Sequence, residues 1–381
     1  MLRAVQFLKR GGRMKEDQAQ PWGTLVMVSL RWVAVCLAAA VLFVGLSFPA
    51  KAEEFIQTAA LSGGQRMVIP MGRAVGIKMF SDGVMVVGLA EVPGEAGTAA
   101  PAKTCGLKQG DIITHINETE VDTIEEVRDV LQELEGEKMS IRAMRGDKQV
   151  QLTAQAVHCE DGSYRLGAWI RDSMAGIGTI TFYDPTSGLF GALGHGINDM
   201  DTALLMPLET GSIMYASVSD VRKGEAGSPG ELHGIFQVNR DLGELFANTS
   251  SGIFGTLTDQ SLAEGLKPVA VANRNEVKVG NAVILSNIAG NTVEEYQVEI
   301  TRIFPAGSRD TRDMMIKVTD PRLLEQTGGI VQGMSGSPIV QNGKLVGAVT
   351  HVMVNDPTQG YGILAESMLN RAGEAANANI A

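Results

Sequence analysis

The sequence predicts a mainly β protein in which a small α+β unit precedes a larger region of short strands, behind an N-terminal apolar segment. The 381 residues include 45 glycines and only 5% aromatic residues, a balance typical of many tight turns between short strands. An amphipathic helix pattern occupies residues 124–134, and a basic lead precedes the apolar segment. Apolar residues make up 44% of the chain, enough to fill the cores of two or three domains.

The N-terminus has the pattern of a signal peptide or an uncleaved membrane anchor. Residues 1–24 form a basic lead, and residues 25–48 are apolar except for Arg31. Ala50-Lys51-Ala52 then gives a small-x-small pattern, and residues 49–65 are expected to form a linker. The basic flank holds its end in the cytoplasm, so the rest of the chain is expected to be exported. A buried globular helix is the alternative interpretation of the apolar segment.

Charge and cysteine content exclude some classes of partner. The net charge is −11, with no basic block after the N-terminus, which argues against nucleic acid as a partner. Cys36 lies in the apolar segment, whereas Cys105 and Cys159 fall in the exported part, where a disulfide between them is an open alternative. No Cys/His cluster has the spacing of metal ligands, so no metal site is expected. The residue patterns described below imply no organic cofactor either.

Residues 66–157 are expected to form the small α+β unit. Strands are predicted at Met67–Pro70, Gly76–Met79, Val84–Leu89, Met139–Met144 and Gln149–Ala154. Thr123 is expected to cap the helix over residues 124–134, with Glu126 at the N3 position of a capping box.

The run from Cys105 to Asn117 resembles the G-L-x-x-G-D-x-I-x-x-I-N signature of peptidase-associated PDZ domains. That resemblance implies that an extended peptide binds by adding a strand to the edge of the domain. The candidate peptide-binding residues belong to a glycine-containing loop at residues 71–77; they are Gly72, Val75, Gly76 and Ile77. The alternative is a small sheet that only packs on its neighbour.

Residues 158–381 are expected to form one or more β-barrels or a sandwich, because short strands alternate with turns throughout. The most informative stretch is Gly-Met-Ser-Gly-Ser-Pro at residues 333–338. Glycines on both sides of Ser335 let backbone N–H groups converge near its hydroxyl, which suits the oxyanion hole of a serine peptidase. Ser337 is the alternative nucleophile.

A serine nucleophile needs a base, and the chain has five histidines. His195 lies in a Gly-His-Gly turn that follows an apolar run, so its side chain is expected at the end of a rigid strand. His351 follows an apolar strand 16 residues after Ser335, and His233 lies where a polar segment becomes apolar. The spacing favours these residues in the order His195, His351, His233.

Three segments together resemble the stage IV sporulation protein B family of serine peptidases: Gly194-His195-Gly196, Val331–Ile339, and the stretch from Gly347 to Gly362. The resemblance covers essentially the whole chain and implies a PDZ domain followed by a trypsin-like double β-barrel. It also implies that His195 is the general base and Ser335 the nucleophile.

The same resemblance assigns the remaining catalytic groups. Asp320, 15 residues before Ser335, is the implied acid that orients the imidazole, and the N–H groups of Gly333 and Ser335 are the implied oxyanion donors. Asp199 and Asp201, just after His195, are local rivals for the acid, and Asp320 has the alternative role of capping the turn before Pro321.

The family resemblance further implies a role in sporulation. Its members are exported into the space between forespore and mother cell and cleave the regulator of a membrane-embedded metalloprotease that activates a mother-cell sigma factor. They also cleave themselves near the N-terminus. Two alternatives are a non-catalytic PDZ adaptor with a peptidase-like scaffold and an envelope quality-control protease. The latter class usually carries its PDZ modules after the catalytic domain, whereas here the PDZ-like unit comes first.

Overall fold

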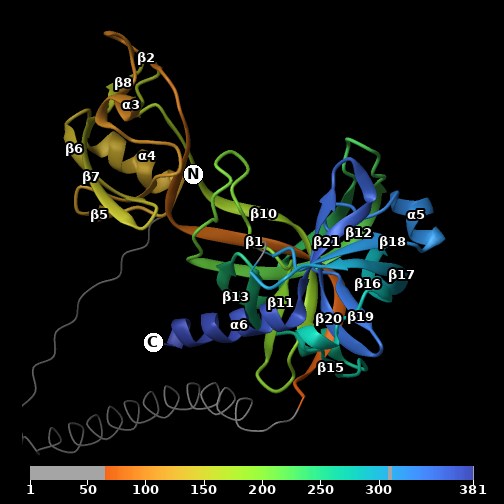
Figure 1. Ribbon diagram of the computed structural model, residues 1–381. Coiled ribbons are helices and arrows are strands. Elements are labelled where there is room, and N and C mark those ends of the chain that lie inside the picture. The colour runs from red at the N-terminus through yellow and green to blue at the C-terminus, as the bar shows by residue number, and fades with distance from the viewer. Residues whose placement is uncertain (1–64, 308–310, 381) are drawn as a thin grey trace, which may run out of the picture. The chain divides into compact units, whose positions relative to one another are not determined.

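The computed structural model describes residues 65–307 and 311–380 (Figure 1). The predicted basic lead, membrane segment and nearly all of the linker lie outside these residues. Within the described ranges, no helix combines the length and the apolar character that crossing a membrane requires.

The PDZ-like unit has a core of its own, built on the second half of strand β1 (Met67–Leu89). Its other strands are β4 (Ile112–Ile116), β5 (Thr119–Glu120), β6 (Lys138–Arg145) and β7 (Lys148–Gln155). Helix α3 (Pro101–Cys105) and the small pairs β2–β3 (Val92–Gly94, Gly97–Ala99) and β8–β9 (Val157–His158, Tyr164–Arg165) complete it.

Helix α4 (Ile124–Glu133) confirms the predicted amphipathic helix to within one residue. Thr123 accepts from the backbone N–H of Glu126, whose carboxylate accepts from the N–H of Thr123, so the predicted capping box is present. Val127 and Leu131 are buried on the face that packs on the PDZ-like core. Both cysteines of the described chain, Cys105 and Cys159, are free thiols.

The first half of strand β1 belongs to the larger region, although residues from 66 onward were predicted to belong to the small α+β unit. This half pairs with β10 (Ala168–Tyr183) and β12 (Thr210–Arg222), and Val75 and Ile77 belong to the core of the larger region. Only from Val84 onward does β1 pack on the PDZ-like core. One strand therefore contributes to both units.

The larger region consists of two closed antiparallel rings of six strands. The first ring runs β1–β10–β11–β14–β13–β12 and back to β1, with β11 at Leu189–Ala192, β13 at Glu231–Thr249 and β14 at Gly252–Leu257. The second runs β16–β17–β18–β21–β20–β19 and back to β16. Its strands are β16 (Gly280–Ala289), β17 (Thr292–Ile303), β18 (Met314–Val318), β19 (Pro338–Gln341), β20 (Lys344–Met353) and β21 (Asp356–Leu364). The predicted mainly β architecture is confirmed.

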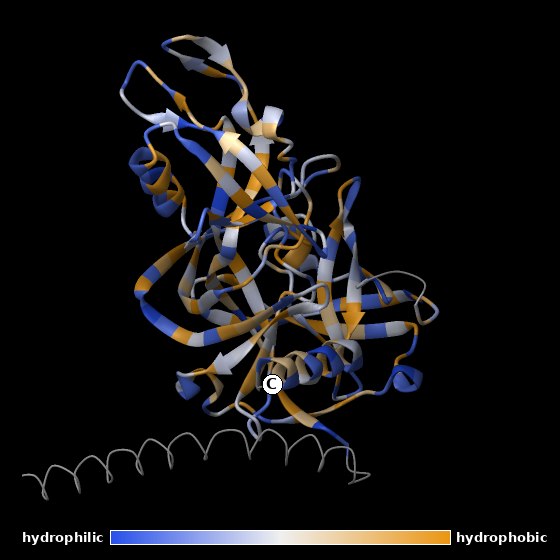
Figure 2. Ribbon diagram, turned by 90° about the vertical axis from the view of Figure 1, so that its left-hand side faces the viewer, coloured by the Kyte–Doolittle hydropathy of each residue, from blue (hydrophilic) through white to orange (hydrophobic). Residues whose placement is uncertain are grey.

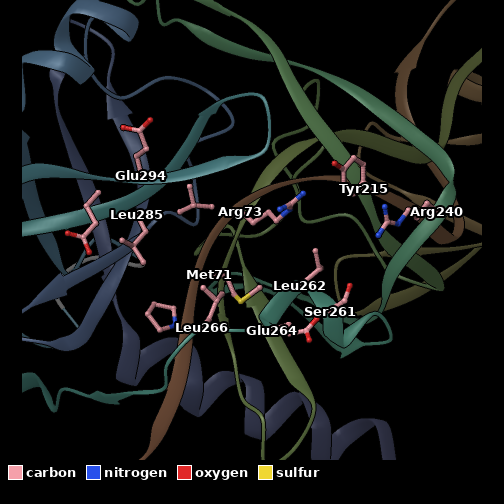
Figure 3. Close-up of a pocket in the computed structure, with 13 residues that line it drawn as sticks. Met71, Arg73, Tyr215, Arg240, Ser261, Leu262, Glu264, Leu266, Leu285 and Glu294 are labelled. Atoms are coloured by element: carbon pink, nitrogen blue, oxygen red, sulfur yellow. The ribbon is translucent and has the colours of Figure 1, made fainter.

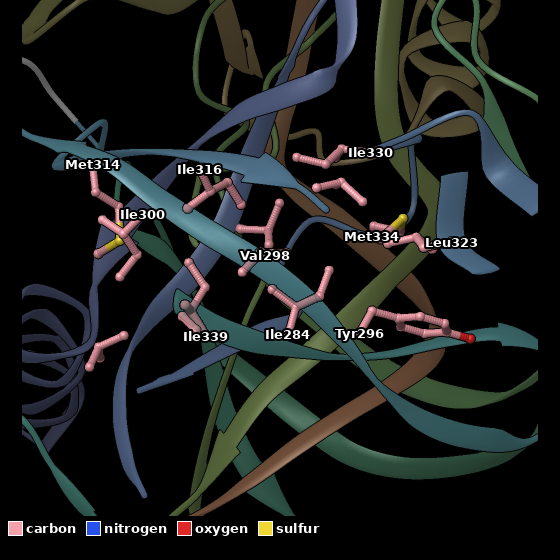
Figure 4. Packing of buried hydrophobic residues seen from close by; sticks show 14 of the residues in the cluster. Ile284, Tyr296, Val298, Ile300, Met314, Ile316, Leu323, Ile330, Met334 and Ile339 are labelled. Carbon is pink, nitrogen blue, oxygen red and sulfur yellow. The ribbon is translucent and has the colours of Figure 1, made fainter. Parts of the chain in front are cut away.

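Alternation of side chains explains why these strands close around apolar interiors. Hydrophobic and hydrophilic residues alternate along many strands (Figure 2), as expected when one face is buried. Tyr296, Ile300 and Ile316 are among the buried residues of the second ring (Figure 4). Strand β15 (Val269–Val271), helices α5 (Pro321–Thr327) and α6 (Ala365–Ile380), and the short helices η1 (Gln260–Ala263) and η2 (Arg274–Glu276) complete the region.

Candidate active site

Ser335 lies on a tight turn just before β19. Its hydroxyl is half-buried and donates a hydrogen bond to the main-chain carbonyl of Thr350 at 2.8 Å. Gly336 has a φ of +97°, and a Cβ at that position would lie 2.0 Å from the carbonyl oxygen of Thr179. Only glycine fits there, so the turn that presents Ser335 depends on the glycine that follows it.

The backbone before Ser335 offers free hydrogen-bond donors. Among the described residues, the amide N–H groups of Gly333 and Ser335 donate to no partner, whereas their carbonyls are both used. The Thr179 side chain donates to the Gly333 carbonyl at 2.8 Å, and the Thr179 N–H donates to the Ser335 carbonyl at 3.1 Å. Thr179 thus fixes the peptide units whose N–H groups are predicted to hold the oxyanion.

Ser337, the alternative nucleophile, has no exposed surface. Its hydroxyl donates to the hydroxyl of Ser286 at 3.1 Å, and Ser286 is also fully buried. A substrate carbonyl has no access to this hydroxyl, so Ser335 is the accessible serine of the motif.

His195 follows β11 through a turn in which Leu193 and Gly194 both have positive φ, of 67° and 71°. Its Nδ1 lies 2.8 Å from the carbonyl oxygen of Gly196. Because a carbonyl oxygen only accepts, Nδ1 must hold the hydrogen, which leaves the Nε2 lone pair for a proton. Burial lowers the pKa of His195, partly offset by the bond to Gly196, so the ring is neutral at neutral pH. This tautomer is the one that a general base requires.

The two histidines ranked highest from the sequence lie together. The ring of His351, on β20, is centred 5.1 Å from that of His195. Burial lowers the pKa of His351 to about 4, with smaller contributions from His195 and Arg312. Its Nδ1 is buried without a hydrogen-bond partner among the described residues. His351 is therefore a neutral neighbour of His195.

Strand β20 is where the predicted base and nucleophile meet. Thr350 accepts the bond from Ser335, a Cβ on Gly194 would lie 2.9 Å from the Thr350 side chain, and the next residue is His351. The described residues contain no hydrogen bond between Ser335 and His195, because the hydroxyl points to Thr350.

Asp320 has a different set of partners. It is the N-cap of α5, accepting from the backbone N–H of Arg322 at 2.9 Å, and it also accepts from the N–H of Gln297 and the Arg322 guanidinium. The Arg322 side chain is the main cause of the lowered pKa of Asp320. The structure thus shows the capping role, and within the described ranges no hydrogen bond joins Asp320 to His195. Its role as the orienting acid stays a prediction.

The local rivals Asp199 and Asp201 are bound to Arg171 of β10. Asp199 is 1% exposed and also accepts from the N–H groups of Asp201 and Thr202. Asp201 lies 2.9 Å from the same guanidinium. These carboxylates order the loop after His195 and do not contact its ring through any hydrogen bond between described residues.

The four predicted peptide-binding residues lie in the first half of β1. Val75, Gly76 and Ile77 pair with β10 on one edge and β12 on the other. A Cβ on Gly72 would lie 2.6 Å from the Leu285 side chain. Since both edges of β1 are occupied there, a peptide cannot add to it as a strand.

A pocket of about 570 Å³ lies away from these groups, since none of the predicted catalytic residues lines it (Figure 3). Arg73 and Arg240 stack on the ring of Tyr215, with guanidinium-to-centroid distances of 5.3 and 4.7 Å. Thr179 and Thr350, by contrast, contact the turn that holds Ser335, and the sequence analysis did not identify them. Their partners are backbone groups distant along the chain, or a serine hydroxyl bound by a backbone carbonyl, and such contacts leave no signal in residue type or spacing.

Comparison with known proteins gives two family matches. A model described as SpoIVB peptidase S55 matches residues 162–369, more than half of the chain. A PDZ domain model matches residues 95–145. A search of curated proteins finds no significant match.

Similar solved structures include the PDZ domain of an SdrC-like protein from Listeria monocytogenes, at 23% identity and TM-score 0.19, covering 23% of this chain and 87% of that one. The HtrA-type protease AlgW with a decapeptide is 10% identical, with a TM-score of 0.32 and coverage of 62% and 56%. The active form of the Rv3671c protease from M. tuberculosis is 15% identical, with a TM-score of 0.30 and coverage of 65% and 85%.

Proposed function

Because the chain belongs to the SpoIVB peptidase S55 family and is a serine peptidase, we propose that it is an exported endopeptidase of sporulation signalling. In this proposal it cleaves the regulator of a membrane-embedded metalloprotease, which then activates a mother-cell sigma factor, and it cleaves itself near the N-terminus. The observation that supports it most is the meeting of His195 and Ser335 at β20 inside the matched segment.

The proposed reaction is hydrolysis through an acyl-enzyme. The Nε2 of His195 takes the hydroxyl proton as the Ser335 oxygen bonds to the scissile carbonyl carbon. The free N–H groups of Gly333 and Ser335 receive the developing oxyanion. His195 then gives the proton to the leaving amine as the C–N bond breaks. Water repeats the sequence, releasing the acyl group and restoring the Ser335 hydroxyl.

In this mechanism the Ser335 hydroxyl and the Asp320 carboxylate would each have to leave the partner that it has in the structure. The Ser335 hydroxyl has to rotate from the Thr350 carbonyl toward Nε2 of His195 before the proton moves. The Gly196 carbonyl already fixes the tautomer of His195, a task usually given to a carboxylate. For Asp320 to act there it would have to leave the N-terminus of α5 and Arg322.

A PDZ domain on a peptidase implies protein substrates. The proposal further places the enzyme in the space between forespore and mother cell, held by its N-terminal apolar segment until self-cleavage. The basic lead and the following apolar run support this location.

The test is incubation of the full-length chain, in detergent, with candidate membrane-protein regulators of intramembrane metalloproteases. Fragment masses of both partners are measured, and S335A is the control. The proposal expects one regulator to be cut at defined bonds and the enzyme to be cut between its apolar segment and residue 65, both only with Ser335 present. Cleavage that persists in S335A, or intact regulators beside a peptidase that cuts other proteins, would overturn it.

A further inference from the structure

His195 and His351 form a pair of adjacent imidazoles beside the predicted nucleophile. Their ring centroids are 5.1 Å apart, and the ring planes are tilted by 40°. His351 follows Thr350 on β20, and the carbonyl of Thr350 accepts from the Ser335 hydroxyl. The pair therefore lies where the predicted base and nucleophile meet, although its two members are far apart in the sequence.

Three of the four ring nitrogens of the pair have no hydrogen-bond partner among the described residues. The exception is Nδ1 of His195, which lies 2.8 Å from the Gly196 carbonyl oxygen. The Nδ1 of His351 is buried and unpaired. The Nε2 atoms of both rings also lack a partner within the described ranges, but neither of them is fully buried. Polar atoms inside proteins are nearly always bonded, so two adjacent rings with three free nitrogens indicate a ligand.

The separation of the two rings suits a single tetrahedral metal ion. Two imidazoles bound to the same Zn²⁺, with Zn–N distances of about 2.0–2.1 Å, have ring centroids about 5 Å apart. The distance between His195 and His351 agrees with this value. Imidazole nitrogen is a preferred ligand of zinc, whereas Mg²⁺ and Ca²⁺ prefer oxygen, so the chemistry of the pair also selects zinc.

Both rings are in the protonation state that binds a metal. Burial is the main cause that lowers the pKa of His195 and that lowers the pKa of His351 to about 4, so both rings are neutral at neutral pH. The Gly196 carbonyl holds the hydrogen of His195 on Nδ1, which leaves the Nε2 lone pair free. Histidines that bind metals are usually oriented by such a bond from their other ring nitrogen.

The pair alone would leave two coordination positions of the ion to water. Within residues 65–307 and 311–380, no group of three or more His, Cys, Asp or Glu side chains could hold a metal. A cation also opposes the ion, because the charge of Arg312 contributes to the lowered pKa of His351. Such an open site is expected to release its ion readily, unlike the closed four-ligand sites that hold structural zinc.

We propose that His195 and His351 bind a Zn²⁺ ion through their Nε2 atoms and that the bound ion holds the peptidase inactive. The ion occupies the lone pair with which His195 takes the Ser335 proton, so the hydroxyl stays unactivated until the ion leaves. No covalent bond of the chain is made or broken, and self-cleavage and substrate cleavage are restrained together. The inhibition rests on the proposed peptidase function, whereas the binding of the ion does not.

The binding experiment is calorimetric titration of the full-length chain, in detergent, with Zn²⁺. All proteins carry S335A, so that no cleavage intervenes, and Mg²⁺ is the control ion. H195Q and H351Q each remove one ligand, and H233Q is the matched control because His233 is exposed and lies outside the pair. The expected result is a zinc site that H233Q retains and that H195Q and H351Q each weaken by about tenfold or more, with all variants folded by circular dichroism.

The second experiment measures the rate at which a fluorophosphonate labels Ser335 in the full-length wild type, H351Q and H233Q. Each protein is compared with its own rate in the absence of zinc. At free Zn²⁺ ten times the measured Kd, the rates of the wild type and H233Q should fall about tenfold and recover with a chelator, while H351Q should need about tenfold more zinc.

Equal zinc affinity in H351Q and H233Q would overturn the site. Binding that depends on both histidines but leaves the labelling rate unchanged would overturn the inhibitory role of the ion. If the wild type were not labelled even without zinc, the proposed peptidase function would be contradicted, and the calorimetry would still decide whether the pair binds the ion.

Discussion

The hydroxyl of Ser335 donates its hydrogen bond to the main-chain carbonyl of Thr350, at 2.8 Å. The residue after Thr350 is His351, and its ring lies beside the ring of His195. The Nδ1 of His195 is 2.8 Å from the Gly196 carbonyl oxygen. The predicted nucleophile and its predicted base therefore both contact strand β20, and no hydrogen bond between them is present among the described residues. A rotation of the serine side chain is the step that the resting geometry leaves for the substrate complex.

Ser335 and Ser337 provide a matched pair of variants. S335A should abolish hydrolysis, whereas S337A should retain it, because the Ser337 hydroxyl is fully buried against Ser286. The measurement is the initial rate of cleavage of a substrate protein by each purified variant. Equal loss in both, with both folded by circular dichroism, would contradict the assignment of Ser335 as the sole nucleophile.

Thr179 is expected to support catalysis without touching the substrate. T179V removes the donor to the Gly333 carbonyl and leaves that buried oxygen unpaired, at a cost of about 1–3 kcal/mol in unfolding free energy. We also expect kcat to fall, because the oxyanion donors next to this carbonyl lose their support.

The matched control is T181V on the same strand, whose buried hydroxyl has no partner among the described residues. Its unfolding free energy should be unchanged or higher. Urea denaturation and kcat measured on both variants decide the question. A T181V enzyme as impaired as T179V would show that the strand, and not the bond, matters.

A substitution at Asp320 distinguishes a structural role, capping helix α5, from a catalytic role, orienting His195. D320N removes the charge that pairs with Arg322 but keeps an oxygen that can cap α5, so we expect a loss of about 1 kcal/mol or less in unfolding free energy. If capping is its main role, the conditions that restore folding, such as lower temperature, should restore most of the activity. A D320N enzyme that is fully folded and yet inactive by several orders of magnitude would establish Asp320 as the orienting acid.

Stability should fall as the pH falls from about 6.5 to 4. The pKa of His351 is about 4 in the folded chain and about 6.5 when unfolded, so the unfolded state binds the extra proton first. The stability that the neutral His351 contributes is fully present above pH 6.5, the pKa in the unfolded chain. It is lost as the pH falls toward 4, the pKa in the folded chain, and the loss is at most about 3 kcal/mol. Thermal unfolding between these pH values should show a shallower slope in H351Q than in H233Q, an exposed control. Equal slopes would contradict the burial of a neutral His351.

Local signals in the sequence predicted some elements well. The capping box at Thr123 located α4, because both halves of the motif are close in sequence. The continuity of β1 was not predictable in the same way, since Gly72, Gly76 and Gly83 interrupt its apolar pattern and suggest breaks. Those glycines allow close approach of Leu285, Met214 and Ile113, partners distant along the chain.

In the candidate site, too, features with a local sequence signal were predicted and features that depend on distant partners were not. Glycine turns predicted His195 and Ser335, because exposing a reactive side chain on a tight turn leaves a strong local pattern. The family resemblance pointed to Asp320, but Arg322, two residues later, is its main partner. The supports from Thr179 and Thr350 involve backbone carbonyls and strand register, which one sequence does not specify.

The most direct test of the paired roles of His195 and Ser335 is the rate at which a fluorophosphonate labels the full-length chain, with the labelled residue mapped by mass spectrometry. The account predicts a single label on Ser335 and a rate lower by about 10²–10⁴-fold in H195A, since the base no longer takes the proton. Labelling of H195A at the wild-type rate, or a label on Ser337, would contradict it.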